Sequence, residues 1–135
     1  MSVNLTVGQK NTKTITVTEE NTAAVYGSGL APVLSTPHVA AMFECACKEL
    51  MDQGLSEGQS SVGASISVAH NAPTPVGMKV VFTVEVVSVE KRKVVFKGTA
   101  SDDCEEVATC EHTRFAIDYA KFIKKVEAKA ASVAH

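Results

Sequence analysis

Two short segments of this 135-residue chain hold side chains whose types and spacing suit nucleophilic catalysis. The first reads Ser-Thr-Pro at residues 35–37, and Glu44 follows Thr36 by eight residues. The second begins with His70 and continues into a proline-rich turn that ends at Gly77. A hydroxyl, a carboxylate and an imidazole are the parts of a nucleophile, an orienting acid and a base. Thr36, Glu44 and His70 are therefore a candidate catalytic set.

Each of these residues also has an ordinary structural interpretation. Thr36 precedes a proline and could simply cap a helix. Glu44 could pair with Lys48, one turn further along the same helix. His70 could be a core histidine that bonds to a backbone carbonyl. Glu44 is the most informative of the three, because a carboxylate on an apolar helix is costly to bury unless it has a partner or a function.

A helix predicted over residues 37–53 must position Thr36 and Glu44. Ser35 or Thr36 would be its N-cap, Pro37 its first helical residue, and Gly54 would stop it. Its apolar side chains cover almost the whole circumference, which is typical of a buried helix that something else must wrap. They are Val39, Ala40, Ala41, Met42, Phe43, Cys45, Ala46, Cys47, Leu50 and Met51.

The helix also limits how the candidate residues can meet. Thr36 and Glu44 are separated by about 12 Å along the helix axis and by about 80° around it. An imidazole with two hydrogen bonds could span part of that gap, but the difference in direction does not ensure a bridge. A contribution from water or from a second subunit therefore stays open.

His70 ends a strand predicted over residues 60–70. Alternation places Val62, Ala64, Ile66 and Val68 on one face, and His70 shares their parity, whereas Gly63 lies on the other face. Further strands are predicted at 78–90, 93–101 and 105–117, with a tight hairpin at 90–92. One or two edge strands are expected within residues 3–17, and Thr18 would cap a short helix that ends at Gly27.

Asp118 can cap a final amphipathic helix that begins at Tyr119. The order of elements is then strand, helices, four strands in a meander, and a helix. This order predicts an α+β architecture in one domain spanning 1–135, with a curved antiparallel sheet wrapped around a central helix.

Composition favours a soluble globular protein, with 45% hydrophobic and 21% charged residues. A net charge of -2 and the lack of a basic block argue against a nucleic acid or a membrane surface as partner. No apolar run approaches the ~20 residues that span a membrane, and the first residues lack the pattern of a signal peptide, so we expect a cytoplasmic protein.

The four cysteines are interpreted as small buried hydrophobes in a reducing compartment. Cys104, Cys110 and His112 could be combined with His70 into a metal set. Their spacing is irregular and contains no zinc-type Cys-x-x-Cys pair, so we expect no metal.

Five sequence features occur together in this chain, and the turn that follows the strand is the most specific of them. They are Pro-Val-Leu-x-Thr-Pro at 32–37, Glu44, Ser-Val-Gly at 61–63, His-x-Ala-Pro-Thr-Pro-x-Gly at 70–77, and Arg114 within His-Thr-Arg. Through these features the chain resembles the fluoroacetyl-CoA thioesterase group of the hot-dog superfamily over roughly residues 15–123.

The resemblance implies a hot-dog fold and an acyl-CoA thioesterase that converts a short or medium acyl-CoA to the acid and free CoA. It implies catalytic roles for Thr36, Glu44 and His70, and substrate-binding roles for Gly63 and Arg114. Coenzyme A would enter only as part of the substrate, without a separate cofactor. We also expect a homodimer, because pairing two such sheets covers their open edges.

The loop before the helix, residues 26–31, contains no Phe that could form an aromatic lid, and the resemblance does not name the acyl group. Two alternative functions remain. One is a hot-dog hydratase or dehydratase for enoyl thioesters, which would need an Asp near His70, where the sequence has none. The other is a non-catalytic acyl-CoA-binding hot-dog protein.

Overall fold

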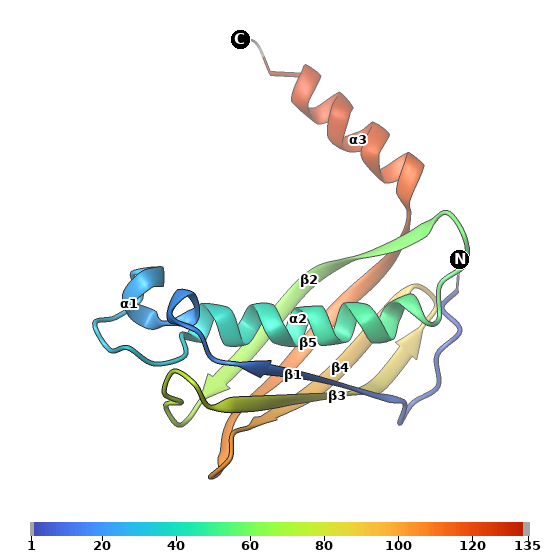
Figure 1. Ribbon diagram of the computed structural model, residues 1–135. Coiled ribbons are helices and arrows are strands. Elements are labelled where there is room, and N and C mark those ends of the chain that lie inside the picture. Colours follow the sequence, from blue (N-terminus) through green and yellow to red (C-terminus); the bar gives the residue numbers. More distant parts are fainter. Residues whose placement is uncertain (1, 134–135) are drawn as a thin grey trace.

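The computed structural model describes residues 2–133, which form a five-stranded antiparallel sheet with a long helix in its concave side (Figure 1). The strands are β1 (Lys10–Thr16), β2 (Gln59–His70), β3 (Lys79–Glu90), β4 (Lys93–Ser101) and β5 (Glu106–Asp118). Their order across the sheet is β1-β3-β4-β5-β2, so β1 and β2 are the edges. The helices are α1 (Ala23–Tyr26), α2 (Thr36–Asp52) and α3 (Tyr119–Ala131), and a 3₁₀ turn, η1 (Glu19–Asn21), precedes α1.

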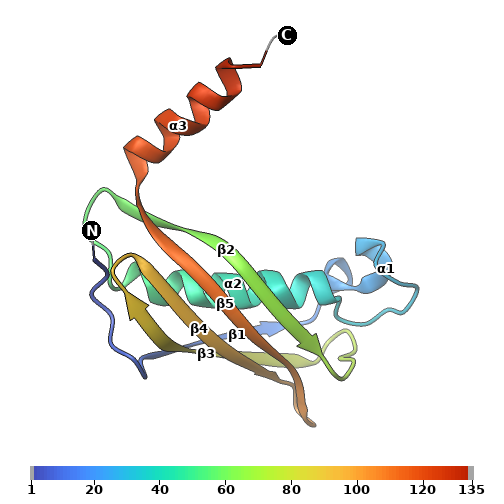
Figure 2. The same cartoon turned by 180° about the vertical axis from the view of Figure 1, so that it is seen from behind.

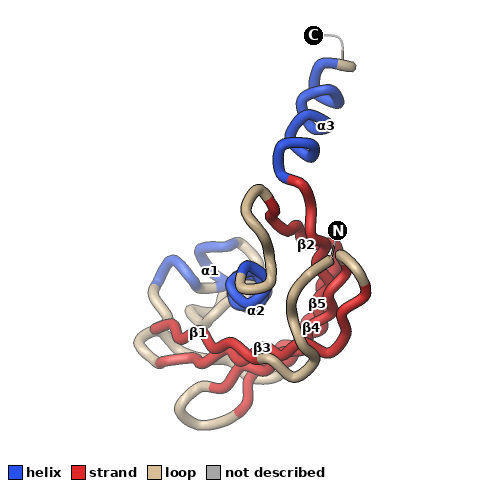
Figure 3. Tube along the Cα trace, turned by 90° about the vertical axis from the view of Figure 1, so that its right-hand side faces the viewer, coloured by secondary structure: helices blue, strands red, loops and turns tan. Residues whose placement is uncertain are grey.

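The sheet curves around α2, as the view along that helix shows (Figure 3). Seen from behind, the strands run across α2 and cover one side of it (Figure 2). Phe43 of α2 meets Phe82 of β3 edge to face, with ring centroids 5.1 Å apart. Gly98 of β4 lets the helix approach closely, because a Cβ there would lie 2.8 Å from the Phe43 ring. The predicted curved sheet around a long helix is confirmed.

The helix α2 starts one residue earlier than predicted. Ser35 is its N-cap and accepts a hydrogen bond from the backbone N–H of His38 at 3.2 Å. Thr36 is then the first helical residue and Pro37 the second. Ser35 therefore caps α2, so the hydroxyl of Thr36 can form a hydrogen bond with another group.

The expectation that α2 is buried all around is wrong. One face of it is buried against the sheet, whereas Ala40, Ala41, Glu44 and Cys45 on other faces remain partly accessible. A single five-stranded sheet curves around only one side of a helix, so the apolar residues of the other side are left half-exposed. The buried residues of α2 are Val39, Phe43, Ala46, Cys47, Leu50 and Met51.

The strand β2 contains a bulge that changes which face its residues occupy. Gly63 pairs with Arg114 of β5, but Ser65 pairs with Thr113, so Ala64 is an extra residue. The predicted faces are correct for Ile66, Val68 and His70. They are wrong before the bulge, because Gly63 shares the face of its buried partner Arg114, which is turned toward α2.

The N-terminal segment forms fewer regular elements than expected. Only Lys10–Thr16 of the segment 3–17 is a strand, and it pairs with β3. The predicted short helix is divided into η1, which Thr18 precedes, and α1, which Thr22 caps. Gly27 ends α1 with a φ of 75°, a conformation that glycine adopts easily.

The final helix is capped as predicted, since the Asp118 carboxylate accepts a hydrogen bond from the backbone N–H of Lys121 at 3.2 Å. α3 projects away from the sheet (Figure 1). Among residues 2–133, we find no helix with the length and apolar character needed to span a bilayer.

Candidate functional site

Thr36 and His70 lie side by side where α2 begins and β2 ends. The Thr36 Oγ1 and the His70 Nδ1 are 2.7 Å apart, a hydrogen-bond distance. Burial lowers the pKa of His70 from its usual value, so the neutral imidazole is favoured. A neutral ring whose Nδ1 accepts the Thr36 hydroxyl hydrogen is the arrangement in which a base activates a nucleophile.

The turn after His70 holds these two residues together. Thr74 is fully buried, and its carbonyl accepts a hydrogen bond from the backbone N–H of Leu34 at 2.9 Å, two residues before Thr36. Its hydroxyl donates to the carboxylate of Asp102 at 3.0 Å, in the turn between β4 and β5. The proline-rich turn is therefore tied both to the approach to α2 and to the sheet.

The other ring nitrogen of His70 is an unpaired polar atom. Nε2 is buried and has no hydrogen-bond partner among residues 2–133. Buried polar atoms in native proteins nearly always have a partner. Nε2 is therefore the atom of the site that most needs a further hydrogen-bond partner.

Glu44 does not join Thr36 and His70 in the described chain. The alternative pair with Lys48 is also not formed, because Lys48 contacts Asp52 instead, with Nζ and Oδ2 at 2.6 Å. Glu44 faces Gly63: a Cβ on that glycine would lie 3.2 Å from the Glu44 Oε2. The predicted catalytic set is thus separated into the Thr36–His70 pair and a second cluster around Glu44.

The second cluster lines an open cavity of about 270 Å³. Its lining consists of Glu44, Gly63, Ala64, Ser65, Ile66 and His112. Ile66 lies four positions before His70 on β2, which is about 13 Å at the rise of a strand. The structure therefore brings Gly63 and Glu44 together, and it places them well away from the Thr36–His70 pair.

Arg114 belongs to this second cluster and is only 6% exposed. Its Nε donates to the hydroxyl of Ser61 at 3.0 Å, and its Nη2 donates to the Ser61 carbonyl at 3.2 Å. A Cβ on Gly63 would lie 3.4 Å from the Arg114 Nη1. Gly63 and Arg114, both predicted as binding residues, thus stand next to each other and to Glu44.

His112 is the residue of this cluster whose role sequence reasoning missed. The sequence suggests it only as a possible member of a metal set, yet it is 1% exposed and contacts both β2 and Arg114. The signal was present in the alternation of β5, where Cys110, His112 and Arg114 share one face. Within the described part of the chain, no three His, Cys, Asp or Glu side chains are close enough to hold a metal.

The cysteines only partly match the expectation of small buried residues. Cys47 and Cys110 are buried, Cys45 is half-buried, and Cys104 is exposed in the turn after β4. Burial raises the pKa of the Cys110 thiol to about 12 and also raises that of Cys47. Both thiols are therefore protonated and unreactive at neutral pH.

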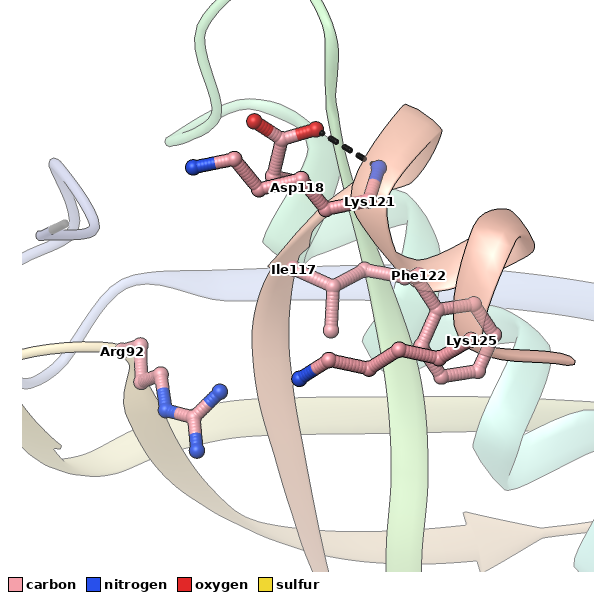
Figure 4. Close-up of a pocket in the computed structure, with 6 residues that line it drawn as sticks. All are labelled: Arg92, Ile117, Asp118, Lys121, Phe122 and Lys125. Carbon is pink, nitrogen blue, oxygen red and sulfur yellow. Dashed lines mark hydrogen bonds between the residues drawn. The ribbon is translucent and has the colours of Figure 1, made fainter. Parts of the chain in front are cut away.

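A basic cavity of about 280 Å³ lies between α3, the end of β5 and the β3–β4 hairpin (Figure 4). It holds none of the candidate catalytic residues and has no nucleophile–base pair. In Figure 4 the side chains of Arg92 and Lys125 extend toward the space over Ile117. Its lining consists of Arg92, Ile117, Asp118, Lys121, Phe122 and Lys125.

Comparison with known structures defines the fold class. A crystal structure of a variant of the fluoroacetyl-CoA-specific thioesterase FlK superposes with a TM-score of 0.86, at 31% identity, covering 93% of this chain and 97% of that one. A second FlK structure, in complex with fluoroacetate and CoA, gives 0.82 at 30% identity, with 87% and 99% covered. A hot-dog-like protein from Thermanaerovibrio acidaminovorans gives 0.86 at 27% identity, with 96% and 94% covered. The fold is a hot-dog fold.

Sequence comparison then defines the family. The family model of fluoroacetyl-CoA-specific thioesterases matches residues 17–120. A fluoroacetyl-CoA thioesterase from Streptantibioticus cattleyicolor is 36% identical over 97 residues, which are 72% of this chain and 70% of that protein. The chain belongs to the fluoroacetyl-CoA-specific thioesterase family. Lys121, Phe122 and Lys125 of the basic cavity lie beyond the matched residues.

Proposed function

We propose that this protein is an acyl-CoA thioesterase whose chemistry takes place at Thr36 and His70. The observation that carries the proposal is the 2.7 Å contact between the Thr36 Oγ1 and the His70 Nδ1. Because Ser35 performs the capping, the Thr36 hydroxyl remains available for the imidazole. The hydroxyl also lies at a helix N-terminus, where the helix dipole favours the negative charge that develops on a thioester carbonyl during attack.

Two routes fit this geometry. In the first, the Thr36 oxygen attacks the thioester carbonyl while His70 takes its proton, the C–S bond breaks, and the thiolate leaves as CoA after it takes that proton. Water then hydrolyses the acyl-threonine. In the second, Thr36 orients a water and His70 takes its proton while the water oxygen attacks the carbonyl; the C–S bond then breaks to give the acid, and the CoA thiolate takes the proton from His70. Rapid quenching followed by mass spectrometry distinguishes the routes, because only the first adds the acyl mass to residue 36.

We further propose that Gly63 and Arg114 bind the substrate at the cavity. We also propose that the negative charge of Glu44, in the wall of the same cavity, contributes to turnover. The cavity is open, and its wall includes the Glu44 carboxylate and the backbone of Gly63. The buried Arg114 lies directly behind that glycine, with its Nη1 3.4 Å from the position of a Cβ on residue 63. An FlK structure contains fluoroacetate and CoA, which supports the choice of an acyl-CoA as ligand. In the loop before α2, Leu30 is 98% exposed, so its side chain covers no other part of the described chain.

We also propose a homodimer formed along the free edge of β2. β2 presents an unpaired edge of 12 residues, and an edge of that length is usually covered. The half-exposed apolar side chains of α2 would be covered in the same assembly. Four free cysteines fit a reducing compartment, so we place the protein in the cytoplasm. Light scattering at micromolar concentration should give the mass of a dimer, and a monomer mass would contradict the pairing.

The test of the function is thiol release across a panel of acyl-CoAs, without added metal. Turnover should fall about 10²–10⁴-fold in His70→Ala, the usual effect of losing a positioned base, and also fall in Thr36→Ala. Thr99→Ala is the matched control, because Thr99 is exposed and lies on the outer face of β4. Near-wild-type turnover in His70→Ala, with an unchanged circular dichroism spectrum, would remove His70 from the reaction.

One observation favours the non-catalytic alternative, an acyl-CoA-binding protein. Glu44 makes no hydrogen bond or ion pair with His70 or Thr36 in the described chain, so the acid of the set is missing from the pair. If no acyl-CoA releases thiol, yet calorimetry detects binding of one, the binding function replaces the enzymatic one.

A further inference from the structure

His112 is a buried histidine whose two ring nitrogens are both engaged. It lies on β5 with 1% of its surface exposed, and its ring stacks near Phe96 of β4 at a centroid distance of 6.4 Å. Its Nδ1 lies 2.8 Å from the carbonyl oxygen of Ser65, on β2. Its Nε2 lies 3.3 Å from the Nη1 of Arg114.

These contacts define the tautomer of the ring. The Ser65 carbonyl can only accept, so Nδ1 carries the hydrogen. Arg114 can only donate, so Nε2 must be the bare nitrogen that accepts from Nη1. Both bonds can form only with a neutral imidazole, and a protonated ring would present an N–H to the guanidinium instead.

Arg114 depends on this bond more than a surface arginine would. It is buried, and no carboxylate among residues 2–133 lies within ion-pair distance of it. Its hydrogen-bond partners are the hydroxyl and the carbonyl of Ser61, which hold Nε and Nη2, and the ring of His112, which holds Nη1. Nη1 is also the Arg114 atom nearest to Gly63 in the cavity wall, so His112 fixes the side of the guanidinium that lies against this glycine.

We propose that His112 is a positioning residue. The Ser65 carbonyl of β2 holds its neutral ring in place, and the ring in turn fixes Arg114 beside the substrate cavity. The proposal rests on the proposed function, in which Arg114 binds the acyl-CoA. It predicts an effect on substrate affinity and not on the chemical step. A hydrogen bond to a charged group is worth roughly ten- to a hundredfold in affinity.

The same geometry predicts that acid weakens binding. Arg114 on β5 and Glu44 on α2 are the charged groups that face the ring, whereas β2 presents a carbonyl and β4 an aromatic ring. Burial and Arg114 lower the pKa of His112, while the bond to Ser65 and the charge of Glu44 raise it. When the ring gains a proton, its Nε2 stops accepting from Arg114, so KM should rise as the pH falls.

The test compares two substitutions that each keep one half of the ring's function. His112→Asn places an amide N–H near Ser65 but offers no acceptor to Arg114, and KM should rise at least tenfold with kcat within about threefold. His112→Gln reaches Arg114 with its amide oxygen, and KM should stay within about threefold while the melting temperature falls. Equal changes of KM in both variants, or changes of KM that follow the melting temperature, would show a merely structural role.

Two measurements on the unaltered protein apply even if a variant fails to fold. Side-chain ¹⁵N NMR should show His112 with its hydrogen on Nδ1, and a hydrogen on Nε2 overturns the proposal. KM should rise on acidification, and a KM that stays constant through the titration of His112 also overturns it. If no acyl-CoA is hydrolysed, only the proposed function fails. The same comparisons are then made with the Kd of a non-hydrolysable acyl-CoA thioether in place of KM. If this thioether does not bind either, both proposals are overturned.

Discussion

Replacing Gly63 with alanine tests whether the cavity beside Glu44 handles the substrate. The new Cβ would lie 3.1 Å from the Cε1 of His112, 3.2 Å from the Glu44 Oε2 and 3.4 Å from the Arg114 Nη1. Carbon atoms prefer separations of about 3.5–4.0 Å, so the neighbours must move by a few tenths of an ångström. Glu44 ends in the open cavity and can yield, whereas His112 is held by two hydrogen bonds.

This substitution should harm activity more than stability. Gly63 has no positive φ, so alanine adds no backbone strain, and the crowded atoms border open space. We expect the free energy of unfolding to fall by about 1 kcal/mol or less, toward the low end of overpacking effects. We expect kcat/KM to fall at least tenfold, about 1.4 kcal/mol of transition-state stabilisation, because the methyl group occupies the substrate's side of Arg114.

Gly98→Ala is the matched control, with the same chemical change in the core. Its Cβ would lie 2.8 Å from the Phe43 ring and 2.9 Å from the Cys110 sulfur, and the fully buried Phe43 ring has no space to yield. Overpacking of this kind costs about 1–3 kcal/mol, or roughly 3–15 °C in melting temperature for a chain of this size. Because Gly98 is not among the residues that line the cavity, kcat/KM per folded molecule should stay within about twofold of wild type.

The assay is thiol release for activity and thermal denaturation for stability, measured on the same preparations. The reasoning requires opposite patterns in the two variants: lost activity with little lost stability at residue 63, and the reverse at residue 98. Wild-type kcat/KM in Gly63→Ala would refute the assignment of the cavity to the substrate. Equal losses of activity in both variants would show that any disturbance near α2 inactivates the protein.

Three further predictions concern Glu44, acidic pH and the turn after His70. Glu44→Gln should reduce turnover at least tenfold with an unchanged or higher melting temperature, since it removes a half-buried charge but keeps its shape; unchanged turnover in thiol release would exclude Glu44 from the site. Burial lowers the pKa values of His112, His70 and His38, so below about pH 6.5 the unfolded chain binds protons that the folded chain does not. Calorimetry should show stability decreasing as the pH falls, by up to about 1.4 kcal/mol per pH unit for each of these histidines, and a flat profile there would contradict it. Thr74→Val should cost about 1–2 kcal/mol and reduce turnover, because it removes the bond to Asp102, while Thr74→Ser should restore both.

The fold was predictable because its strongest signals are local. The cap, the proline and the glycine define α2 to within one residue, and the alternation in residues 60–117 defines four strands. The sequence placed Thr36 at the start of a helix and His70 at the end of a strand, but it did not ensure a contact between them, which the structure shows at 2.7 Å. The burial of α2 was overestimated, because an apolar sequence does not tell which of its faces a neighbouring sheet will cover.

The placement of Glu44 was not predictable from spacing. Lys48 has an acid four residues away on both sides, Glu44 and Asp52, and both pairs have the same helical geometry. The structure selects Asp52, and no periodicity in the sequence distinguishes the two. Whether Glu44 reaches His70 depended in turn on a relation between α2 and β2 that tertiary packing alone decides.

The bulge in β2 explains how one strand serves both clusters. Gly63 and His70 are seven positions apart, so in a regular strand they would lie on opposite faces. Their partners on β5, Arg114 and Ala108, are six positions apart and face α2 together. The extra residue Ala64 corrects the parity of β2, so that Gly63 in the cavity wall and the imidazole of His70 both lie on the face turned toward α2. The bulge is therefore a functional feature of the fold, since without it the binding cluster and the Thr36–His70 pair would be separated by the sheet itself.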